Sequence, residues 1–351
     1  MIYEFNLLII KIISILIFSG LLSLLLVPIY LKIAQRLKLS DTFVSKERLI
    51  QAPIASTTLQ EKADTPTMGG VIIWLPPIIL ALFFYLLKNF FGGYFDFLNF
   101  LTRNETYLPI FGLFLGGIIG LIDDILNKFK KGHKFGAKEK LLIYLGIAIF
   151  FAWWFTVKLN YRFIEIVDFR FFIPFPIFFI IFVFVFLATS LSFNEIDGLD
   201  GLFAGVAISI LIFLLFVSLV EAKYNLASFI SALLGSLTVY LWFNSYPALF
   251  FDGNNGSFSV GTSIALMSFL TSTYLLLPLI GLSLVIESGS VILQQISKRL
   301  FKRKIFLSTP IHHHFKAKGM KEPKIVIRFW IINFLGVLLG LIFYFVIKGL
   351  K

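Results

Sequence analysis

The residues best suited to chemistry in this chain are carboxylates beside long apolar segments. Asp123 and Asp124 are adjacent, in Gly-Leu-Ile-Asp-Asp-Ile at the end of one apolar stretch. Two neighbouring carboxylates repel each other, so a pair in this position needs a cation or a proton close by. Two further short segments, 194–202 and 250–257, contribute acidic and amide side chains at Asn194, Asp197, Asp200, Asp252 and Asn254.

Oxygen ligands of this kind suit Mg²⁺ or Mn²⁺, which in proteins usually also contact substrate phosphates. Basic loops elsewhere in the chain are able to hold the rest of an anionic substrate. Together these features predict a phosphoryl-transfer site with a metal, positioning lysines and a carboxylate that removes a proton. Each feature also has a plain structural interpretation, namely a solvated helix end for Asp123–Asp124 and a tight turn for the segment Asp197–Gly201.

The elements that must position these side chains are membrane spans. Of the 351 residues, 58% are hydrophobic and only 14% are charged, whereas soluble domains carry about 25% charged residues. Ten apolar stretches are long enough to cross a hydrocarbon core of ~30 Å, at residues 6–31, 69–88, 108–126, 141–159, 174–193, 201–220, 226–244, 259–273, 275–296 and 325–347. We therefore expect an all-α polytopic membrane protein of about ten transmembrane helices, forming one domain over residues 1–351. The absence of cysteine excludes disulfides and thiolate chemistry.

Basic residues predict the orientation of these spans. The loops 32–68, 127–140 and 297–324 contain 21 of the 31 Lys and Arg residues, and all three follow odd-numbered spans. Basic loops lie on the cytoplasmic side, which also explains the net charge of +12 without invoking nucleic acid. The carboxylate segments follow odd-numbered spans as well. The sequence therefore predicts an active-site cleft at the cytoplasmic face of the membrane.

Four of the motifs resemble those of one enzyme superfamily. They are the block Thr65-Pro66-Thr67-Met68-Gly69-Gly70, the pair Asp123-Asp124, the pattern of Asn194, Asp197 and Asp200, and Pro310-Ile311-His312-His313-His314-Phe315 followed by Gly319 and Glu322-Pro323. From about Thr65 to its C-terminus, the chain resembles the polyprenyl-phosphate N-acetylhexosamine-1-phosphate transferases, and specifically the phospho-N-acetylmuramoyl-pentapeptide transferases (MraY type). The first block and the histidine block separate this branch from the relatives that transfer N-acetylglucosamine phosphate.

The resemblance implies a reaction and a location. UDP-N-acetylmuramoyl-pentapeptide and undecaprenyl phosphate would give lipid I and UMP, with Mg²⁺ as cofactor, in peptidoglycan precursor synthesis. The enzyme would reside in the bacterial cytoplasmic membrane as a possible homodimer.

Roles follow residue by residue from the matched motifs. The implied catalytic residues are Asp123, Asp124 and Asp252, and the implied metal ligands are Asp197, Asp252 and Asn254. Substrate binding is implied for Lys62, Thr65, Asn194, Asp200, His312, His313 and His314, although His314 also suits a structural role. Glu287 matches an acidic position of the family and suits either the cleft or the packing of its helix.

One departure from the family pattern concerns the metal. The family has Met-Gly-Asp where this chain has Asp252-Gly253-Asn254, so an amide occupies the usual metal-binding position and an additional carboxylate lies two residues before it. An amide is a weaker Mg²⁺ ligand than a carboxylate and does not act as a base. Either Asp252 replaces the missing aspartate or the chain is impaired.

Three other functions fit parts of the sequence. A transferase for UDP-N-acetylglucosamine would share the carboxylates but not the histidine block. A cation-coupled transporter would also use acidic residues and ten spans, but its charges are expected near the middle of the bilayer and in repeated halves. An inactive relative with a scaffold role would account for Asn254.

Overall fold

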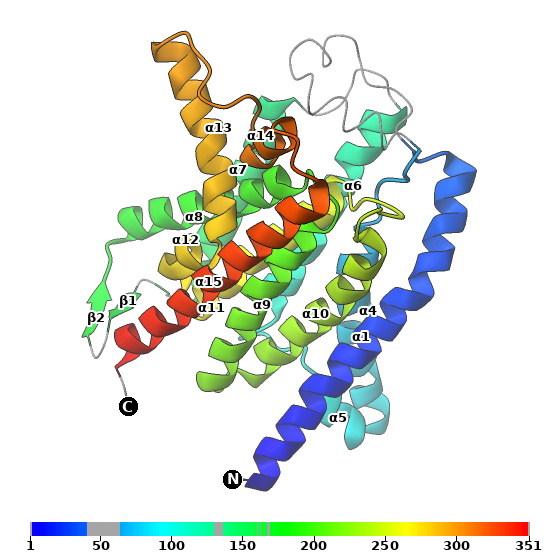
Figure 1. The fold of residues 1–351 in the computed structure, drawn as a ribbon. Helices are drawn as coiled ribbons and strands as arrows, with labels where there is room; N and C mark the ends of the chain where they lie inside the picture. The colour runs from blue at the N-terminus through cyan, green and yellow to red at the C-terminus, as the bar shows by residue number, and fades with distance from the viewer. Residues whose placement is uncertain are drawn as a thin grey trace.

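The computed structural model describes residues 2–40, 64–129, 136–159, 161, 163–166 and 169–349. Its helices are α1 (Ile2–Leu37), α4 (Val71–Phe91), α5 (Tyr94–Leu98), α6 (Tyr107–Phe129), α7 (Ala137–Trp153) continued by the π-helix η1 (Trp154–Lys158), α8 (Phe175–Ile196), α9 (Leu202–Val220), α10 (Tyr224–Asn244), α11 (Asn254–Leu270), the 3₁₀-helix η2 (Tyr274–Leu276), α12 (Leu277–Ile280), α13 (Leu282–Leu300), α14 (Ile311–Ala317) and α15 (Glu322–Lys348). The long helices form a bundle, and α13 projects from one end of it (Figure 1).

The expectation of an all-α membrane protein is confirmed for the described residues, but the count of ten spans is not. Eight helices are long and apolar enough to cross a membrane, and the bent pair of η2–α12 with α13 makes nine at most. The expected stretch 259–273 corresponds to α11, which has 17 residues and is buried from Asn255 to Phe269. Its surface faces other helices instead of lipid, because α6 and α8 pack against it.

A stripe of glycines brings α6 close to α11. Gly112, Gly116 and Gly120 recur every four residues and therefore lie on one face of α6. A methyl group at Gly116 would come within 2.8 Å of the backbone of α11, and one at Gly120 within 2.5 Å. Small residues allow this close approach of helix backbones. The stripe thereby brings the C-terminal part of α6, with Asp123 and Asp124, against the first turn of α11.

Two features were absent from the sequence-based expectations. The expected span 275–296 is broken at Gly281, where η2–α12 and α13 are bent by 82°. The strands β1 (Phe163–Ile166) and β2 (Phe169–Phe172) pair as an antiparallel hairpin at the end of the bundle opposite the tip of α13 (Figure 1). The hairpin is small and does not change the fold class.

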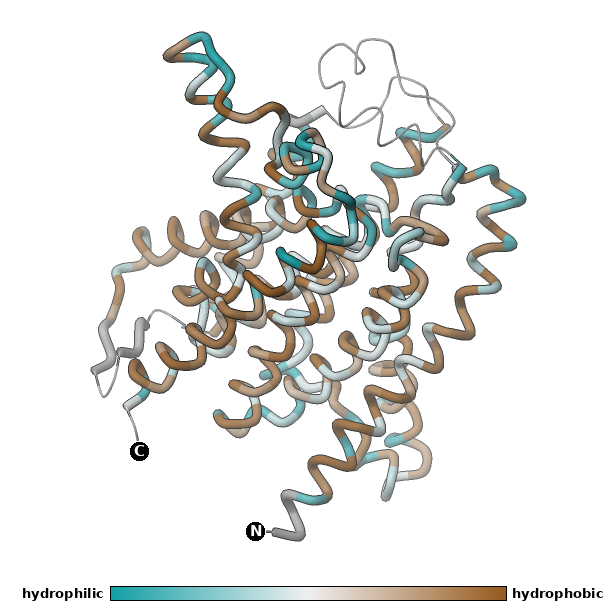
Figure 2. The backbone as a smooth tube through the Cα atoms, in the orientation of Figure 1, coloured by the Kyte–Doolittle hydropathy of each residue, from teal (hydrophilic) through white to brown (hydrophobic). Residues whose placement is uncertain are grey.

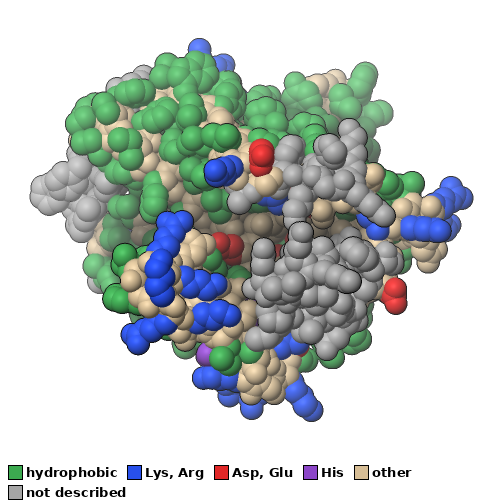
Figure 3. All heavy atoms as spheres, turned by 90° about the horizontal axis from the view of Figure 1, so that it is seen from above, with side chains coloured by type: hydrophobic (Ala, Val, Ile, Leu, Met, Phe, Trp, Pro, Cys, Tyr) green, Lys and Arg blue, Asp and Glu red, His purple; other side chains and the backbone are tan. Residues whose placement is uncertain are grey.

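Hydropathy is distributed along the bundle as expected for a membrane protein. The middle of the long helices is hydrophobic, whereas hydrophilic residues gather towards the end that carries α14 and the tip of α13 (Figure 2). A view onto this end shows acidic side chains in a hollow with Lys and Arg side chains around it (Figure 3). We call it the polar end of the bundle.

Candidate active site

The predicted carboxylates and amides meet at the polar end of the bundle. Asp123 and Asp124 lie in the C-terminal part of α6, and Asn194 lies in the last turn of α8. Asp252 precedes α11, and Asn254 is its first residue. Hydrogen bonds between residues 60 to 131 positions apart in the chain join four of the five side chains directly. Helix packing, not local sequence, therefore assembles the site.

The amide of Asn254 is the centre of this cluster. Its Nδ2 donates to Oδ2 of Asp123 at 2.9 Å and to Oδ1 of Asp124 at 2.7 Å. Its Oδ1 accepts a hydrogen bond from Nδ2 of Asn194 at 2.9 Å, and Nζ of Lys140 lies 3.4 Å away. The Lys140 ammonium also lies 2.6 Å from Asp123. One amide and one ammonium thus offset the repulsion between the two adjacent carboxylates, which is the role that the sequence assigned to a cation or a proton.

Asp124 caps the N-terminus of α11. Its carboxylate accepts from the backbone N–H groups of Asn254 at 3.0 Å and Asn255 at 3.2 Å, and from Nδ2 of Asn255 at 3.0 Å. A helix N-terminus has unpaired N–H donors and a partial positive charge, so a carboxylate is favourable there. The indole N–H of Trp74 donates to Oδ1 of Asn255 at 3.1 Å and fixes the orientation of the Asn255 amide. Both oxygens of Asp124 therefore have protein partners.

Asp252 is in a different environment from Asp124. Its carboxyl is fully buried, and Oδ1 accepts a hydrogen bond from the Tyr240 hydroxyl at 3.3 Å. Its Oδ2 lies against Gly256, and the carboxyl of Asp197 lies within hydrogen-bonding reach of the Asp252 carboxyl. Burial raises the pKa of Asp252 well above its ordinary value, and the nearby carboxyl of Asp197 raises it further. A buried acceptor oxygen beside a second carboxyl is an arrangement that a bound cation would stabilise.

The histidine block is more buried than we expected for side chains that contact a substrate. His312 and His313, both in α14, are buried, whereas His314 is partly exposed. Nδ1 of His312 lies 3.0 Å from Oε2 of Glu287, and both of these side chains are fully buried. His314 accepts a hydrogen bond from the backbone N–H of Leu307 at 3.1 Å. The pair of Glu287 and His312 therefore joins α13 to α14.

Gly198 provides the space for the buried imidazole. A methyl group at this position would overlap Nε2 of His312, and Glu287 holds the ring from its other side. We expect Gly198→Ala to lower the free energy of unfolding by about 1–3 kcal/mol, the usual range for overpacking. Thermal unfolding of the purified protein measures this effect. Gly146→Ala is the matched control, because nothing lies within 4 Å of the added methyl group, and equal melting temperatures for the two variants would contradict the contact.

A cavity of about 840 Å³ lies between the segment 246–251, which precedes Asp252, and residues 316–324. Asp200 forms part of its wall: its backbone N–H donates to Glu322 at 2.8 Å, and its Oδ2 accepts from the N–H of Ala248 at 3.0 Å. Lys316 lies 3.3 Å from Glu322. The cavity is also lined by Thr65, Phe251, Lys321 and Lys324. Its three ammonium groups make it suited to an anionic molecule.

Comparison with known proteins identifies the family. The profile of Glycosyl transferase family 4 matches residues 107–272, and signature 1 of phospho-N-acetylmuramoyl-pentapeptide-transferases matches residues 62–73. The chain is 35% identical to the phospho-N-acetylmuramoyl-pentapeptide-transferase of Caldanaerobacter subterraneus subsp. tengcongensis, over 79% of this chain and 83% of the relative. It is 34% identical to that of Desulforamulus reducens, over 92% and 93%, and 30% identical to that of Bacillus anthracis, over 92% and 94%.

The chain belongs to the phospho-N-acetylmuramoyl-pentapeptide-transferase family. With its apolar helices and its bacterial relatives, it is a bacterial integral membrane protein. The transporter is not favoured by these matches, and neither is the N-acetylglucosamine transferase.

Six of the twelve predicted site residues of this family member lie in the carboxylate cluster, whereas the three histidines lie in α14. Lys62 falls within the matched signature but lies outside the described residues. Thr65 and Asp200 line the cavity instead of joining the carboxylate cluster. The sequence assigned no role to Lys140, Asn255 or Lys321. Lys140 and Lys321 were part of the basic loops, so their charge was noticed, but the sequence does not show which loop lysine reaches the carboxylates.

Proposed function

We propose that this protein transfers phospho-N-acetylmuramoyl-pentapeptide from its UDP donor to undecaprenyl phosphate, giving lipid I and UMP. The observation that supports the proposal is the cluster around Asp123 and Asp124, together with a lysine-lined cavity that Phe251, the neighbour of Asp252, also lines, in a chain of this family. An oxygen of the lipid phosphate attacks the phosphorus that bears the sugar. The bond from that phosphorus to the UMP oxygen breaks, and UMP leaves with the electron pair.

The cavity is the proposed place of the donor. Lys316, Lys321 and Lys324 line it and offer cations to a diphosphate, and its volume of about 840 Å³ accommodates a nucleotide-sized group. Asp200 and Glu322 maintain its wall through the hydrogen bonds described above. In this proposal, Thr65 contacts the donor from the cavity wall, and Asn194 contacts it from the carboxylate cluster. His312 acts by positioning the loop at Gly198. His313 and His314 remain proposed donor contacts.

The residues present fit a divalent cation. The carboxyl of Asp252 is buried beside the carboxyl of Asp197, so the two offer paired oxygen ligands. We propose that these two carboxylates hold Mg²⁺, because the Asn254 oxygen is already engaged by Asn194. Within the described residues no three His, Asp or Glu side chains are arranged as a metal site, so the remaining ligands would be donor phosphate oxygens and water. Bound there, the ion would neutralise charge on the diphosphate.

Asp123 is the proposed proton acceptor. Its Oδ2 accepts a hydrogen bond from Asn254 and lies 2.6 Å from the Lys140 ammonium, whereas both oxygens of Asp124 bind the N-terminus of α11. Asp123 would accept the proton of the lipid phosphate, and Asp124 would orient the residues around it. A two-step path through a phosphorylated Asp123 uses the same geometry. Exchange of labelled UMP into the donor in the absence of lipid acceptor would favour the two-step path, and no exchange would favour direct attack.

The proposal is tested by UMP release from the detergent-purified protein. We expect release with UDP-N-acetylmuramoyl-pentapeptide, undecaprenyl phosphate and Mg²⁺, and loss of release on chelation with EDTA. UDP-N-acetylglucosamine is the control donor and should give no UMP. No release with either donor would mean that the protein is an inactive relative.

Two aspects of the proposal concern the surroundings of the site. We propose that the polar end of the bundle faces the cytoplasm, supported by the concentration of Lys and Arg in its loops. Protection of Lys321 from a membrane-impermeant amine reagent in intact cells, but not in lysed cells, would agree with this orientation.

A homodimer is also proposed, and the mass of the purified protein by light scattering tests it.

A further inference from the structure

The helix α13 has an inverted distribution of polar and apolar residues. Its buried face is mostly polar, with Ser283, Glu287, Ser290, Gln294 and Ser297. Its exposed residues are mostly apolar, namely Val285, Ile292, Leu293, Ile296 and Leu300, and the exposed polar ones are Gln295, Lys298 and Arg299. In a soluble protein these faces would be reversed. The exposed face of α13 is therefore a lipid-facing surface that extends to the last residue of the helix.

The segment after α13 folds back onto the polar face of the helix. The side chain of Gln294 accepts hydrogen bonds from the backbone N–H groups of Ile305 and Phe306, and it donates to the carbonyl of Phe306 at 2.9 Å. The hydroxyl of Ser297 donates to the carbonyl of Arg303 at 2.9 Å. These bonds hold residues 301–306 against the helix. The end of α13 and this segment are thus held together by hydrogen bonds, and we call them the α13 tip (residues 298–307).

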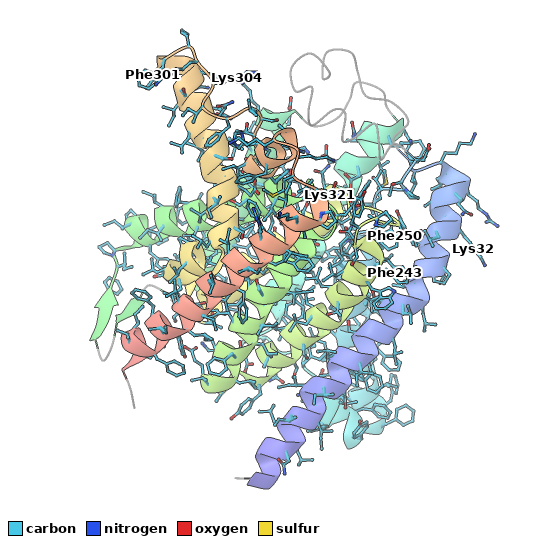
Figure 4. The ribbon with its side chains drawn as sticks, in the orientation of Figure 1. Lys32, Phe243, Phe250, Phe301, Lys304 and Lys321 are labelled. Carbon is cyan, nitrogen blue, oxygen red and sulfur yellow. The ribbon has the colours of Figure 1, made fainter. Side chains whose placement is uncertain are left out.

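The α13 tip combines cations with exposed large apolar side chains. Leu300 is 70% exposed and Phe301 is 65% exposed. Phe301 and Lys304 lie at the point of the tip, away from the bundle (Figure 4). The remaining members of the surface are the exposed apolar residues Ile305 and Leu307 and the exposed cations Lys298, Arg299, Lys302 and Arg303. No acidic residue occurs between positions 288 and 321, so nothing within this segment neutralises the five cations.

We propose that the α13 tip binds anionic phospholipid headgroups at the membrane surface, with Leu300 and Phe301 inserted at the boundary of the acyl chains. Basic residues next to exposed apolar ones are the pattern of segments that lie in the membrane interface. An acidic soluble protein would also match the charge. Lipid is favoured because the apolar surface of the tip continues the exposed stripe of α13 without a break. The tip would anchor the helix that carries Glu287, and so the histidine block, to the membrane.

A nitroxide at the tip tests this proposal. The chain has no cysteine, so Ile305→Cys provides a single labelling site. The purified, labelled protein is placed in nanodiscs of phosphatidylcholine, alone or mixed with phosphatidylglycerol. Collisions with oxygen, which dissolves in the membrane, are compared with collisions with a water-soluble nickel chelate. We expect the label to be shielded from nickel in the anionic nanodiscs and more accessible in the neutral ones.

Charge-neutral variants make the test specific. Each cation near an anionic surface favours binding by roughly fivefold. The triple variant Lys302→Gln, Arg303→Gln, Lys304→Gln should therefore lower the ratio of inserted to free tip by at least about tenfold. The matched control is Lys32→Gln, Arg36→Gln, Lys38→Gln, which removes three exposed cations from the end of α1. An equal fall in the ratio of inserted to free tip in both triple variants would overturn the proposal. A label that stays exposed to water in both lipids would also overturn it, and would assign the tip to a soluble partner.

Discussion

Asp252→Asn is expected to lower Mg²⁺-dependent UMP release by at least about a hundredfold, while leaving the protein as stable as before. Loss of a carboxylate ligand removes several kcal/mol of charge stabilisation at the metal, and each 1.4 kcal/mol corresponds to about tenfold in rate. Asparagine has nearly the same shape as aspartate, so it keeps the acceptor for Tyr240. Its N–H₂ group can also occupy the position of Oδ2 and donate to the carboxyl of Asp197.

Activity and stability are therefore expected to respond differently at position 252. UMP release and thermal unfolding would be measured on the same preparation, and binding of Mn²⁺ would be followed by its electron paramagnetic resonance signal. Asp96→Asn serves as the control, because Asp96 is an exposed aspartate in α5 that pairs with Lys88 at 2.8 Å. Full activity in Asp252→Asn would remove this residue from the mechanism. A large fall in melting temperature would show a structural role instead.

Asn254→Asp is expected to destabilise the protein without metal by about 3 kcal/mol or more. The substitution removes the two N–H bonds to Asp123 and Asp124, and each lost hydrogen bond to a buried charged group is worth about 1.5–3 kcal/mol. It also places a third carboxylate against the pair, which adds repulsion. The variant restores the residue that the family has at this position, so the usual family residue is here the unfavourable one in the absence of a cation.

Divalent metal should reverse most of this loss. A ligand present at a hundred times its dissociation constant stabilises the folded state by about 2.7 kcal/mol, and the added carboxylate would strengthen binding. Melting temperatures would be compared in EDTA and in Mg²⁺ for the wild type, Asn254→Asp and the exposed control Asn89→Asp. A variant as stable as the wild type in EDTA would show that the Asn254 amide does not hold the carboxylate pair together.

The departure at Asn254 acquires a structural explanation from these contacts. In the sequence, the amide looked like the loss of a metal ligand, and the choice was between substitution by Asp252 and an impaired enzyme. In the structure the amide cross-links α6 and α8 through Asp123, Asp124 and Asn194. The two differences from the family are thus linked in space, because Asn254 donates hydrogen bonds to one pair of carboxylates and Asp252 forms another pair with Asp197.

The sequence by itself determined the class of the protein, its helices and its motifs. Apolar stretches of about 20 residues specify membrane helices locally, and each of the ten expected stretches corresponds to a helix or, for 275–296, to a bent pair of helices. Hydropathy does not reveal whether a helix faces lipid or protein, so the burial of α11 and the break at Gly281 were not foreseen. The hairpin of β1 and β2 was missed because it lies between apolar segments of similar composition.

Only the tertiary structure decided which side chains act together. The glycine stripe of α6 brings Asp123 and Asp124 to residues about 130 positions later in the chain. It was also the structure that buried His312 against Gly198 and aligned the polar residues of α13 inward. These arrangements depend on the packing of helices that are distant in sequence. Spacing along the chain specifies the turn on which a residue lies, but the neighbouring helix determines its partner.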